Sequence, residues 1–166
     1  MIKLLSIIIF LLVSFLNAKE NPDFAKININ EIYILPQDNK IIKDKIEELI
    51  IGSKSEIQIA MYNFSYKKYA KALVKTSKKG VDITILLDSE KIKKDDEIYK
   101  YLKNNGIKTI ISNRKMHIKA AVFDKEIAIL GSINWTKDSF DENNEVVLLT
   151  KDKKVIFRLR DFIKNN

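Results

Sequence analysis

Short apolar stretches of strand type alternate with segments of helical spacing along residues 31–166. Alternating or continuously apolar runs predict strands at 31–35, 56–61, 81–87, 107–111, 118–123, 127–130 and 145–149. Apolar residues three and four positions apart predict helices at 38–52, 65–80, 95–105 and 152–163. Asp38 and Ser65 are the expected caps of the first two helices. We expect a short helix or structured loop at 132–140, and a solvated loop at 88–96.

The order of these elements indicates the fold class. Strands and helices alternate through the first part of the chain, and a hairpin with a tight turn at 124–126 follows. Alternating elements favour helix-covered parallel strands, whereas a hairpin joins antiparallel ones. The sequence therefore predicts a single α/β domain over residues 31–166, with a mixed β-sheet flanked by helices on both faces.

The first 18 residues differ from the rest. They hold 14 apolar residues and a single charge, Lys3, and they end in Leu16-Asn17-Ala18. This is the layout of a secretory signal peptide. The apolar run of about 13 residues is shorter than the ~20 that span a bilayer, which favours a cleaved signal over an N-terminal membrane anchor. We expect an exported protein, periplasmic or secreted, with membrane attachment through residues 1–18 as the alternative and an extended segment at 19–30.

Composition and charge narrow the chemistry. The 166 residues include no Cys and one His, which excludes a disulfide scaffold, a Cys-ligated metal site and a self-contained His-rich metal site. The chain has 30 Lys+Arg against 22 Asp+Glu. Because Lys3 is the only charge in the first 18 residues, the remainder carries a net +7. Such a charge favours a polyanionic partner.

The one histidine lies in a polar constellation. His117 and Lys119 are two positions apart on a predicted strand, so their side chains project from the same face. The returning strand ends at Gly131, which Ser132 and Asn134 follow. The hairpin thus gathers an imidazole, an ammonium, a hydroxyl and a carboxamide, a set that suits a phosphate group. An imidazole beside a bound phosphate can attack phosphorus or move a proton.

The spacing of these residues resembles a known motif. His117 and Lys119, then four residues to Asp124, then six to Gly131-Ser132-Ile133-Asn134, is similar to the full HKD motif of the phospholipase D superfamily. The chain looks closest to the small single-motif members, which are secreted bacterial endonucleases of the Nuc type and the mitochondrial cardiolipin hydrolase (Zucchini) group. The resemblance extends over residues 31–163.

The resemblance implies a role for each motif residue. His117 would be the nucleophile that forms a covalent phosphohistidine. Lys119, Ser132 and Asn134 would bind the phosphate and the charge of the transition state. Glu145 occupies the position of a glutamate that orients the histidine in Nuc-type enzymes. The family works without a metal, so we expect no metal and no cofactor.

Two of the acidic candidates also have plainer interpretations. Asp124 belongs to the motif and is included among the catalytic candidates, but it lies at the predicted turn, where Asp is a common residue. Glu145 begins a predicted strand, where a glutamate is usually a solvated edge charge.

A single motif supplies a single histidine. Two-motif members of the family place two histidines in one active site, where one attacks and the other protonates the leaving group. A C2 dimer brings the same residue of both copies together at the dyad. The resemblance therefore implies an active site that is complete only in a homodimer.

Three further residues are candidates for a nucleic-acid groove. Arg114 and Lys115 come just before His117, in a loop without acidic residues. Trp135 follows the motif, where it can either stack on a base or cap the hydrophobic core.

The sequence leaves three functions open. Charge and resemblance favour a non-specific endonuclease with DNA or RNA as its substrate. A phospholipase D-type hydrolase of phosphatidyl lipids such as cardiolipin is the alternative, since the same charge attracts anionic lipid. No exposed amphipathic helix with an aromatic face is evident, which weighs against the lipid. A secreted binder that takes up nucleic acid without catalysis is the third.

Overall fold

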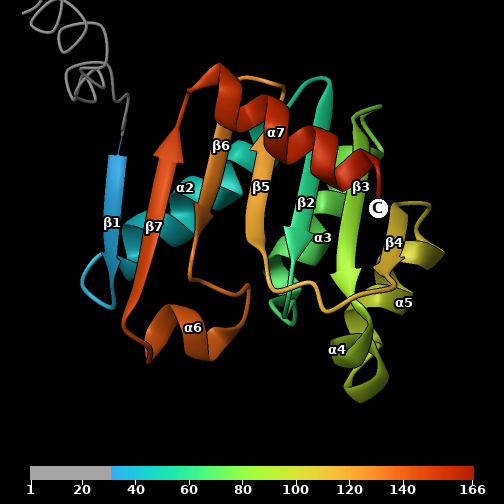
Figure 1. Cartoon of the computed structure of the whole chain (residues 1–166), viewed down its shortest axis with the longest axis horizontal. Coiled ribbons are helices and arrows are strands. Elements are labelled where there is room, and N and C mark those ends of the chain that lie inside the picture. The colour runs from blue at the N-terminus through green and yellow to red at the C-terminus, as the bar shows by residue number, and fades with distance from the viewer. Residues whose placement is uncertain (1–30) are drawn as a thin grey trace, which may run out of the picture.

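The computed structural model describes residues 31–166, so the predicted signal peptide at 1–18 and extended segment at 19–30 lie outside the described residues. One sheet with strand order β1-β7-β6-β5-β2-β3-β4 forms the centre of the domain (Figure 1). Its strands are β1 (Glu31–Leu35), β2 (Glu56–Met61), β3 (Asp82–Asp88), β4 (Lys108–Ser112), β5 (Lys119–Phe123), β6 (Ile127–Gly131) and β7 (Glu145–Thr150).

The sheet is mixed because its two halves are connected differently. Strands β2, β3 and β4 pair in parallel, and helices carry the chain across between them. All other neighbouring pairs are antiparallel, including the β5–β6 hairpin. The helices are α2 (Asn39–Gly52), α3 (Lys67–Ser77), α4 (Ser89–Lys94), α5 (Glu97–Asn104), α6 (Lys137–Asp141) and α7 (Lys153–Lys164).

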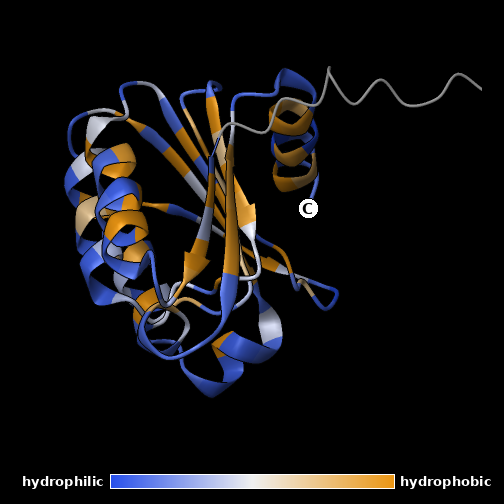
Figure 2. Cartoon of the chain, turned by 90° about the vertical axis from the view of Figure 1, so that its left-hand side faces the viewer, coloured by the Kyte–Doolittle hydropathy of each residue, from blue (hydrophilic) through white to orange (hydrophobic). Residues whose placement is uncertain are grey.

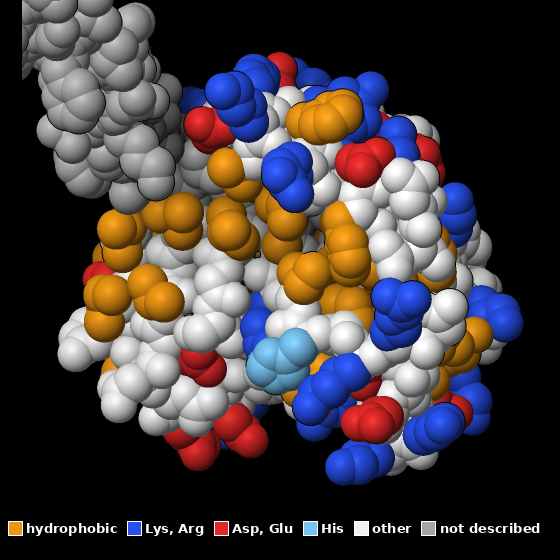
Figure 3. Space-filling view, viewed as in Figure 1, with side chains coloured by type: hydrophobic (Ala, Val, Ile, Leu, Met, Phe, Trp, Pro, Cys, Tyr) orange, Lys and Arg blue, Asp and Glu red, His pale blue; other side chains and the backbone are white. Residues whose placement is uncertain are grey.

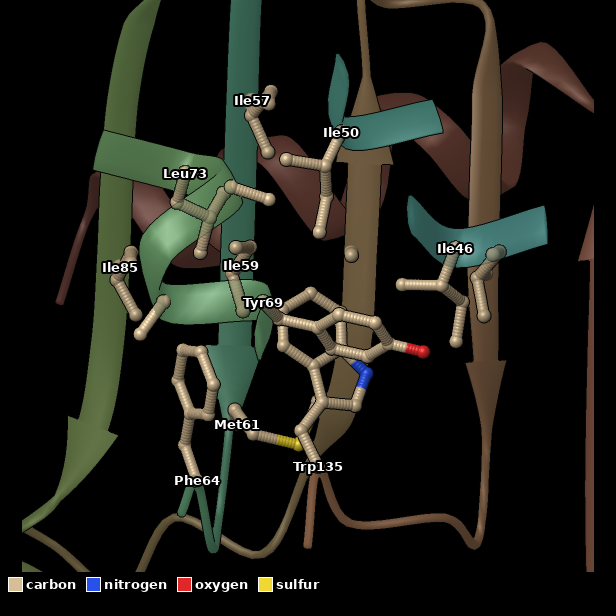
Figure 4. Packing of buried hydrophobic residues seen from close by; sticks show 14 of the residues in the cluster. Ile46, Ile50, Ile57, Ile59, Met61, Phe64, Tyr69, Leu73, Ile85 and Trp135 are labelled. Atoms are coloured by element: carbon tan, nitrogen blue, oxygen red, sulfur yellow. The ribbon is translucent and has the colours of Figure 1, made fainter. Parts of the chain in front are cut away.

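Helices cover both faces of the sheet, and the main core lies on one of them. The sheet stands between α2 and α3 on one side and α7 on the other (Figures 1 and 2). Five of the six residues of β2 are buried, as expected for a strand that is paired on both edges and covered on both faces. Behind β2 the largest buried side chains, Trp135 and Tyr69, pack edge to face beside Met61 (Figure 4). The predicted fold class is confirmed.

The face beneath α7 is only partly covered. Helix α7 contacts β2, β3, β5 and β6 but leaves the β1–β7 end of that face open. There Ile32, Ile34 and Val146 are 54%, 48% and 45% exposed. Register places Ile32 opposite Leu148, and Ile34 opposite Val146, so these side chains share one face. Apolar atoms gather over this half of the sheet in Figure 3.

Local predictions failed where side chains had competing partners. Asp38 sits at the N-cap of α2, but its carboxylate accepts from the Ile34 N–H at 2.8 Å and makes no cap bond. Helix α3 begins at Lys67 rather than at Ser65, because the N–H groups of Ser65 and Tyr66 both donate to the Trp135 carbonyl at 2.9 Å.

The segment predicted as a solvated loop at 88–96 contains helix α4. The carboxylate of Asp88 accepts from the N–H groups of Glu90 and Lys91 and so caps this helix. Ile41, one of the apolar residues of α2, is 55% exposed. The buried stripe of α2 runs through Ile42 and two further isoleucines at four-residue spacing, which turns Ile41 outward.

Candidate active site

The central strand β5 positions the histidine and the lysine. His117 lies in an extended segment just before β5, which begins at Lys119. Antiparallel register places Lys119 opposite Met61 of β2, and Ala120 opposite Leu130 of β6. Lys119 therefore lies beside the end of β6, where Ser132 follows.

Gly131 allows β6 and β7 to approach closely at this end. A Cβ built there would lie 2.1 Å from the backbone oxygen of Val146, so only glycine fits. Just beyond it the Ser132 N–H donates to the same oxygen at 3.0 Å. The position of Ser132 is thus set by the backbone of β7.

His117 and Lys119 form the centre of the site. His117 is exposed, whereas Lys119 is 7% exposed. The Lys119 ammonium donates to the carbonyl oxygen of His117 at 2.8 Å, and lies 3.1 Å from Nδ1 of its ring. A cation in this position disfavours a second positive charge on the imidazole.

Tyr62 holds the histidine ring from the side of β2. The two ring centroids are 4.3 Å apart at a tilt of 54°. The Lys119 ammonium lies 4.8 Å from the Tyr62 ring centroid, and the Tyr62 N–H donates to the Ile118 carbonyl at 3.0 Å. Tyr62 was not among the site residues predicted from the sequence. The feature that could have indicated it is its place directly after Met61, which pairs with Lys119.

Asp88 fixes the segment before the histidine. This fully buried carboxylate at the end of β3 accepts the Met116 N–H at 2.9 Å. Its other oxygen caps α4. The sequence pattern showed an acid at the end of a buried strand but gave no indication of its partner.

Glu145 bonds to the serine rather than to the histidine. Its carboxylate accepts a short hydrogen bond from the Ser132 hydroxyl and a second one from Asn143 Nδ2 at 3.2 Å. The Ser132 hydroxyl also accepts the Val146 N–H at 3.1 Å. No hydrogen bond joins Glu145 to His117 within residues 31–166, so its predicted role as the orienting partner has no support in the single chain. Register across β6 and β7 is the reason.

The motif asparagine is held by the loop after Tyr62. Asn134 Oδ1 accepts from the Asn63 N–H at 3.2 Å, which leaves its amide NH₂ group as a donor.

Trp135 is 1% exposed and contacts Phe64 and Tyr69 in the core. Its proposed place in a nucleic-acid groove is therefore wrong, and the core-capping alternative is correct.

Asp124 lies away from the other motif residues, at the opposite end of β5 from Lys119. Its carboxylate accepts from the N–H groups of Lys54, Ser55 and Glu56, and from the Ser55 hydroxyl. Asp124 itself has φ 51°. These contacts give Asp124 a structural role, because they join the turn to the start of β2.

The basic loop shares a hollow with the histidine. Arg114 and Lys115 are exposed, and with His117, Phe162 and other residues they line a hollow of about 250 Å³. Figure 3 shows His117 open to solvent near Lys and Arg side chains. The structure thus brings these two groove candidates to the site.

The electrostatics favour a neutral imidazole. Desolvation, followed by the charges of Lys119 and Lys115, lowers the pKa of His117 below its usual value. Desolvation also lowers the pKa of Lys119, against an opposing effect of Glu145. His117 is therefore mostly an unprotonated nucleophile or base at pH 7.

Neither a metal centre nor a membrane span is found in the described part of the chain. In residues 31–166 no three His, Cys, Asp or Glu side chains are grouped so that they can hold a metal ion. No helix in the same range is long and apolar enough to cross a bilayer.

Comparison with known proteins identifies the family. Residues 46–165, well over half of the chain, match the family described as cardiolipin synthase, PLD-like domain. The chain belongs to the phospholipase D superfamily. This agrees with the resemblance carried by the HKD motif.

Relatives within the superfamily include both a cardiolipin hydrolase and a phospholipase D. A mitochondrial cardiolipin hydrolase of Xenopus laevis is 26% identical over 109 residues, which is 64% of this chain and 52% of the relative. A phospholipase D of Rickettsia prowazekii is 28% identical over 138 residues, 80% of this chain and 64% of the relative. The chain thus spans about half to two thirds of the length of these relatives.

A solved superfamily structure confirms the fold. Nuc of Salmonella typhimurium, described as a phospholipase D family member, is 24% identical and superposes with a TM-score of 0.72. The similarity covers 81% of this chain and 91% of Nuc.

Replacing Asp124 by Ala is expected to cost stability, by about 1–3 kcal/mol, since the N–H groups of Lys54, Ser55 and Glu56 lose a charged acceptor. Burial raises the pKa of Asp124. Hydrogen bonds from the N–H groups of Ser55, Lys54 and Glu56 together outweigh this effect, so the pKa is lowered overall. A depressed folded pKa contributes stability above the unfolded value and loses it as the pH falls through the folded one. The difference between the two proteins in urea unfolding should thus shrink from pH 6 to pH 3. Loss of activity with unchanged stability would instead support a catalytic Asp124.

The single histidine makes its titration directly measurable. We expect the one imidazole Cε1–H signal in NMR to titrate with a midpoint below about 6.5. Lys115→Gln should raise this midpoint, because it removes a positive neighbour. Lys93→Gln, on the exposed side of α4, is the control and should leave it in place. A midpoint above the usual histidine range would contradict this electrostatic picture.

Proposed function

We propose that the protein is a metal-independent phosphodiesterase that cleaves DNA or RNA without sequence preference, through a phosphohistidine, in a homodimer. The observation that carries the proposal is the exposed His117 ring, held between the Lys119 ammonium and the Tyr62 ring. It faces a hollow that Arg114 and Lys115 also line. A neutral imidazole beside fixed cations is suited to attack an anionic phosphorus centre.

The proposed reaction proceeds in two balanced steps. A ring nitrogen of His117 forms a bond to phosphorus while one P–O ester bond breaks, and the leaving oxygen takes a proton from the imidazolium of a second copy's histidine. Water then attacks the phosphohistidine, the P–N bond breaks, and the second imidazole takes the proton from this water. Lys119, Ser132 and the Asn134 amide donate to the phosphate oxygens, where charge builds up in each transition state.

Nucleic acid is the preferred substrate because the cations near His117 lie on an open surface. A shallow basic surface contacts backbone phosphates with little reading of bases. The whole chain has a net charge of +8, and a positive charge attracts the phosphates of nucleic acid.

A phosphatidyl lipid is the second candidate, and one observation favours it. Phe157 on α7 is 65% exposed, and together with Lys153, Lys154 and Arg158 it lines a second hollow, along α7. The expectation that no helix exposes an aromatic side chain on a basic face is therefore wrong. A basic face with an apolar tip suits an anionic bilayer. The cardiolipin hydrolase relatives point to the same substrate class.

The open apolar face of the sheet supports a homodimer. Val146 directly follows Glu145, and Ile118 lies between His117 and Lys119, so this face adjoins the site. A two-fold contact on it would bring the His117 residues of both copies toward each other. Large exposed apolar surfaces of this kind mark contact sites.

Metal-free cleavage is the direct test of the function. In EDTA, wild type is expected to cut single-stranded DNA, double-stranded DNA or RNA, and His117→Ala to lose at least about 10³-fold, since the covalent step is removed. Cleavage should also fall steeply as salt rises. The readout is the length distribution of labelled substrates.

Cardiolipin vesicles are tested beside the nucleic acids, as the substrate that a lipid hydrolase would cleave. Release of phosphatidic acid without nucleic-acid cleavage would establish the lipid hydrolase. Tight binding of nucleic acid with no cleavage by wild type would establish the non-catalytic binder. Cleavage that survives in His117→Ala would contradict the assignment of the nucleophile.

Association of two copies is tested on the apolar face. Ile32→Glu should convert the dimer to a monomer in analytical ultracentrifugation and abolish most activity, because it places a charge in the contact. Ile41→Glu is the matched control, since Ile41 is equally exposed but lies on α2. A fully active monomer would contradict the dimer hypothesis.

A further inference from the structure

Helix α4 is held near the histidine by polar contacts at its start and by Ile92, which packs against the core while partly exposed. None of its six residues is buried. One Asp88 oxygen accepts the N–H groups of Glu90 and Lys91, and the other accepts the N–H of Met116. A single buried carboxylate therefore ties the start of α4 to the residue before His117.

Lys91 projects from this helix onto the site. Its ammonium lies 4.8 Å from the centroid of the Tyr62 ring, the same ring that contacts His117. The Lys119 ammonium lies at the same distance from that centroid. Lys91 also lowers the pKa of both His117 and Lys119, as a nearby positive charge does.

Lys91 has no carboxylate partner among residues 31–166. Several lysines of the domain, such as Lys67 and Lys100, form ion pairs with acidic side chains. In the described part of the chain none is formed by Lys91, whose contact is the Tyr62 ring. Two ammonium groups held on one ring repel each other, and an anion placed between or beside them offsets this repulsion.

The two ammonium groups are close enough for neighbouring phosphates of one strand to reach both. Each lies 4.8 Å from the same ring centroid, so the two nitrogen atoms are at most about 9.6 Å apart. Each DNA strand carries one phosphate per roughly 3.4 Å of helix axis, so the phosphate next to the attacked one stays near the site.

We infer that Lys91 binds the phosphate next to the one attacked by His117, and that α4 thereby selects a phosphate chain over an isolated phosphodiester. The inference rests on the proposed function, whose substrate it narrows. Asp88 is the positioning residue that keeps Lys91 and the histidine segment at a fixed separation.

The test compares two substrates in two variants. Lys91→Gln should lower kcat/KM for a single-stranded oligonucleotide about five- to tenfold, mainly through KM, and its loss should exceed the loss on bis(4-nitrophenyl) phosphate at least fivefold. The small diester has no second phosphate. Lys93→Gln removes the same charge from the exposed side of the same helix and should stay within about twofold on both substrates.

Binding separates this inference from the proposed function. In the His117→Ala background, adding Lys91→Gln should reduce the salt slope of oligonucleotide binding by about 0.7, measured by fluorescence anisotropy. This change would support the phosphate contact even if wild type cut no nucleic acid. Equal losses on both substrates, or an unchanged salt slope, would overturn it.

Discussion

The site depends on burying the ammonium of Lys119. A charge that is 7% exposed requires compensation from its surroundings, or it loses its proton. The chain supplies part of this compensation through the carbonyl oxygen of His117 and the face of Tyr62. The same two contacts also hold the histidine. The groups that stabilise the Lys119 charge therefore also orient the His117 ring. The remaining positive potential is directed at an anionic substrate.

The topology of the sheet makes this interaction possible. Strand β5 pairs with β2 on one side and β6 on the other, so residues from three parts of the chain converge at its N-terminal end. Tyr62 follows β2, Asp88 ends β3 and Ser132 follows β6. Each lies at the end of an element whose interior is buried, so the packed core positions the polar groups. A rigid core and polar strand ends are a common basis for active sites.

The two faces of the sheet serve different purposes. The face toward α2 and α3 is closed by the large aromatic cluster that includes Trp135, and it supplies stability. The face toward α7 is closed only in part and leaves Ile32 and Val146 exposed next to the site. An enzyme with one histidine per chain needs a second copy for a two-histidine mechanism, and the incompletely covered face is where a second copy gains most from burial.

Period and motif in the sequence determined the strands, most helices and the candidate residues His117, Lys119, Ser132 and Asn134, because local spacing reports which face a residue occupies. For Asp124 and Trp135 the sequence left a structural and a functional interpretation open, because position in a motif does not report contacts made across the sheet. Register decided that Glu145 meets Ser132 instead of the histidine. Only the tertiary structure added Tyr62, Asp88 and Lys91, which lie 26 to 55 positions from His117 in the chain. No local pattern records such proximity, because strand pairing between distant segments creates it.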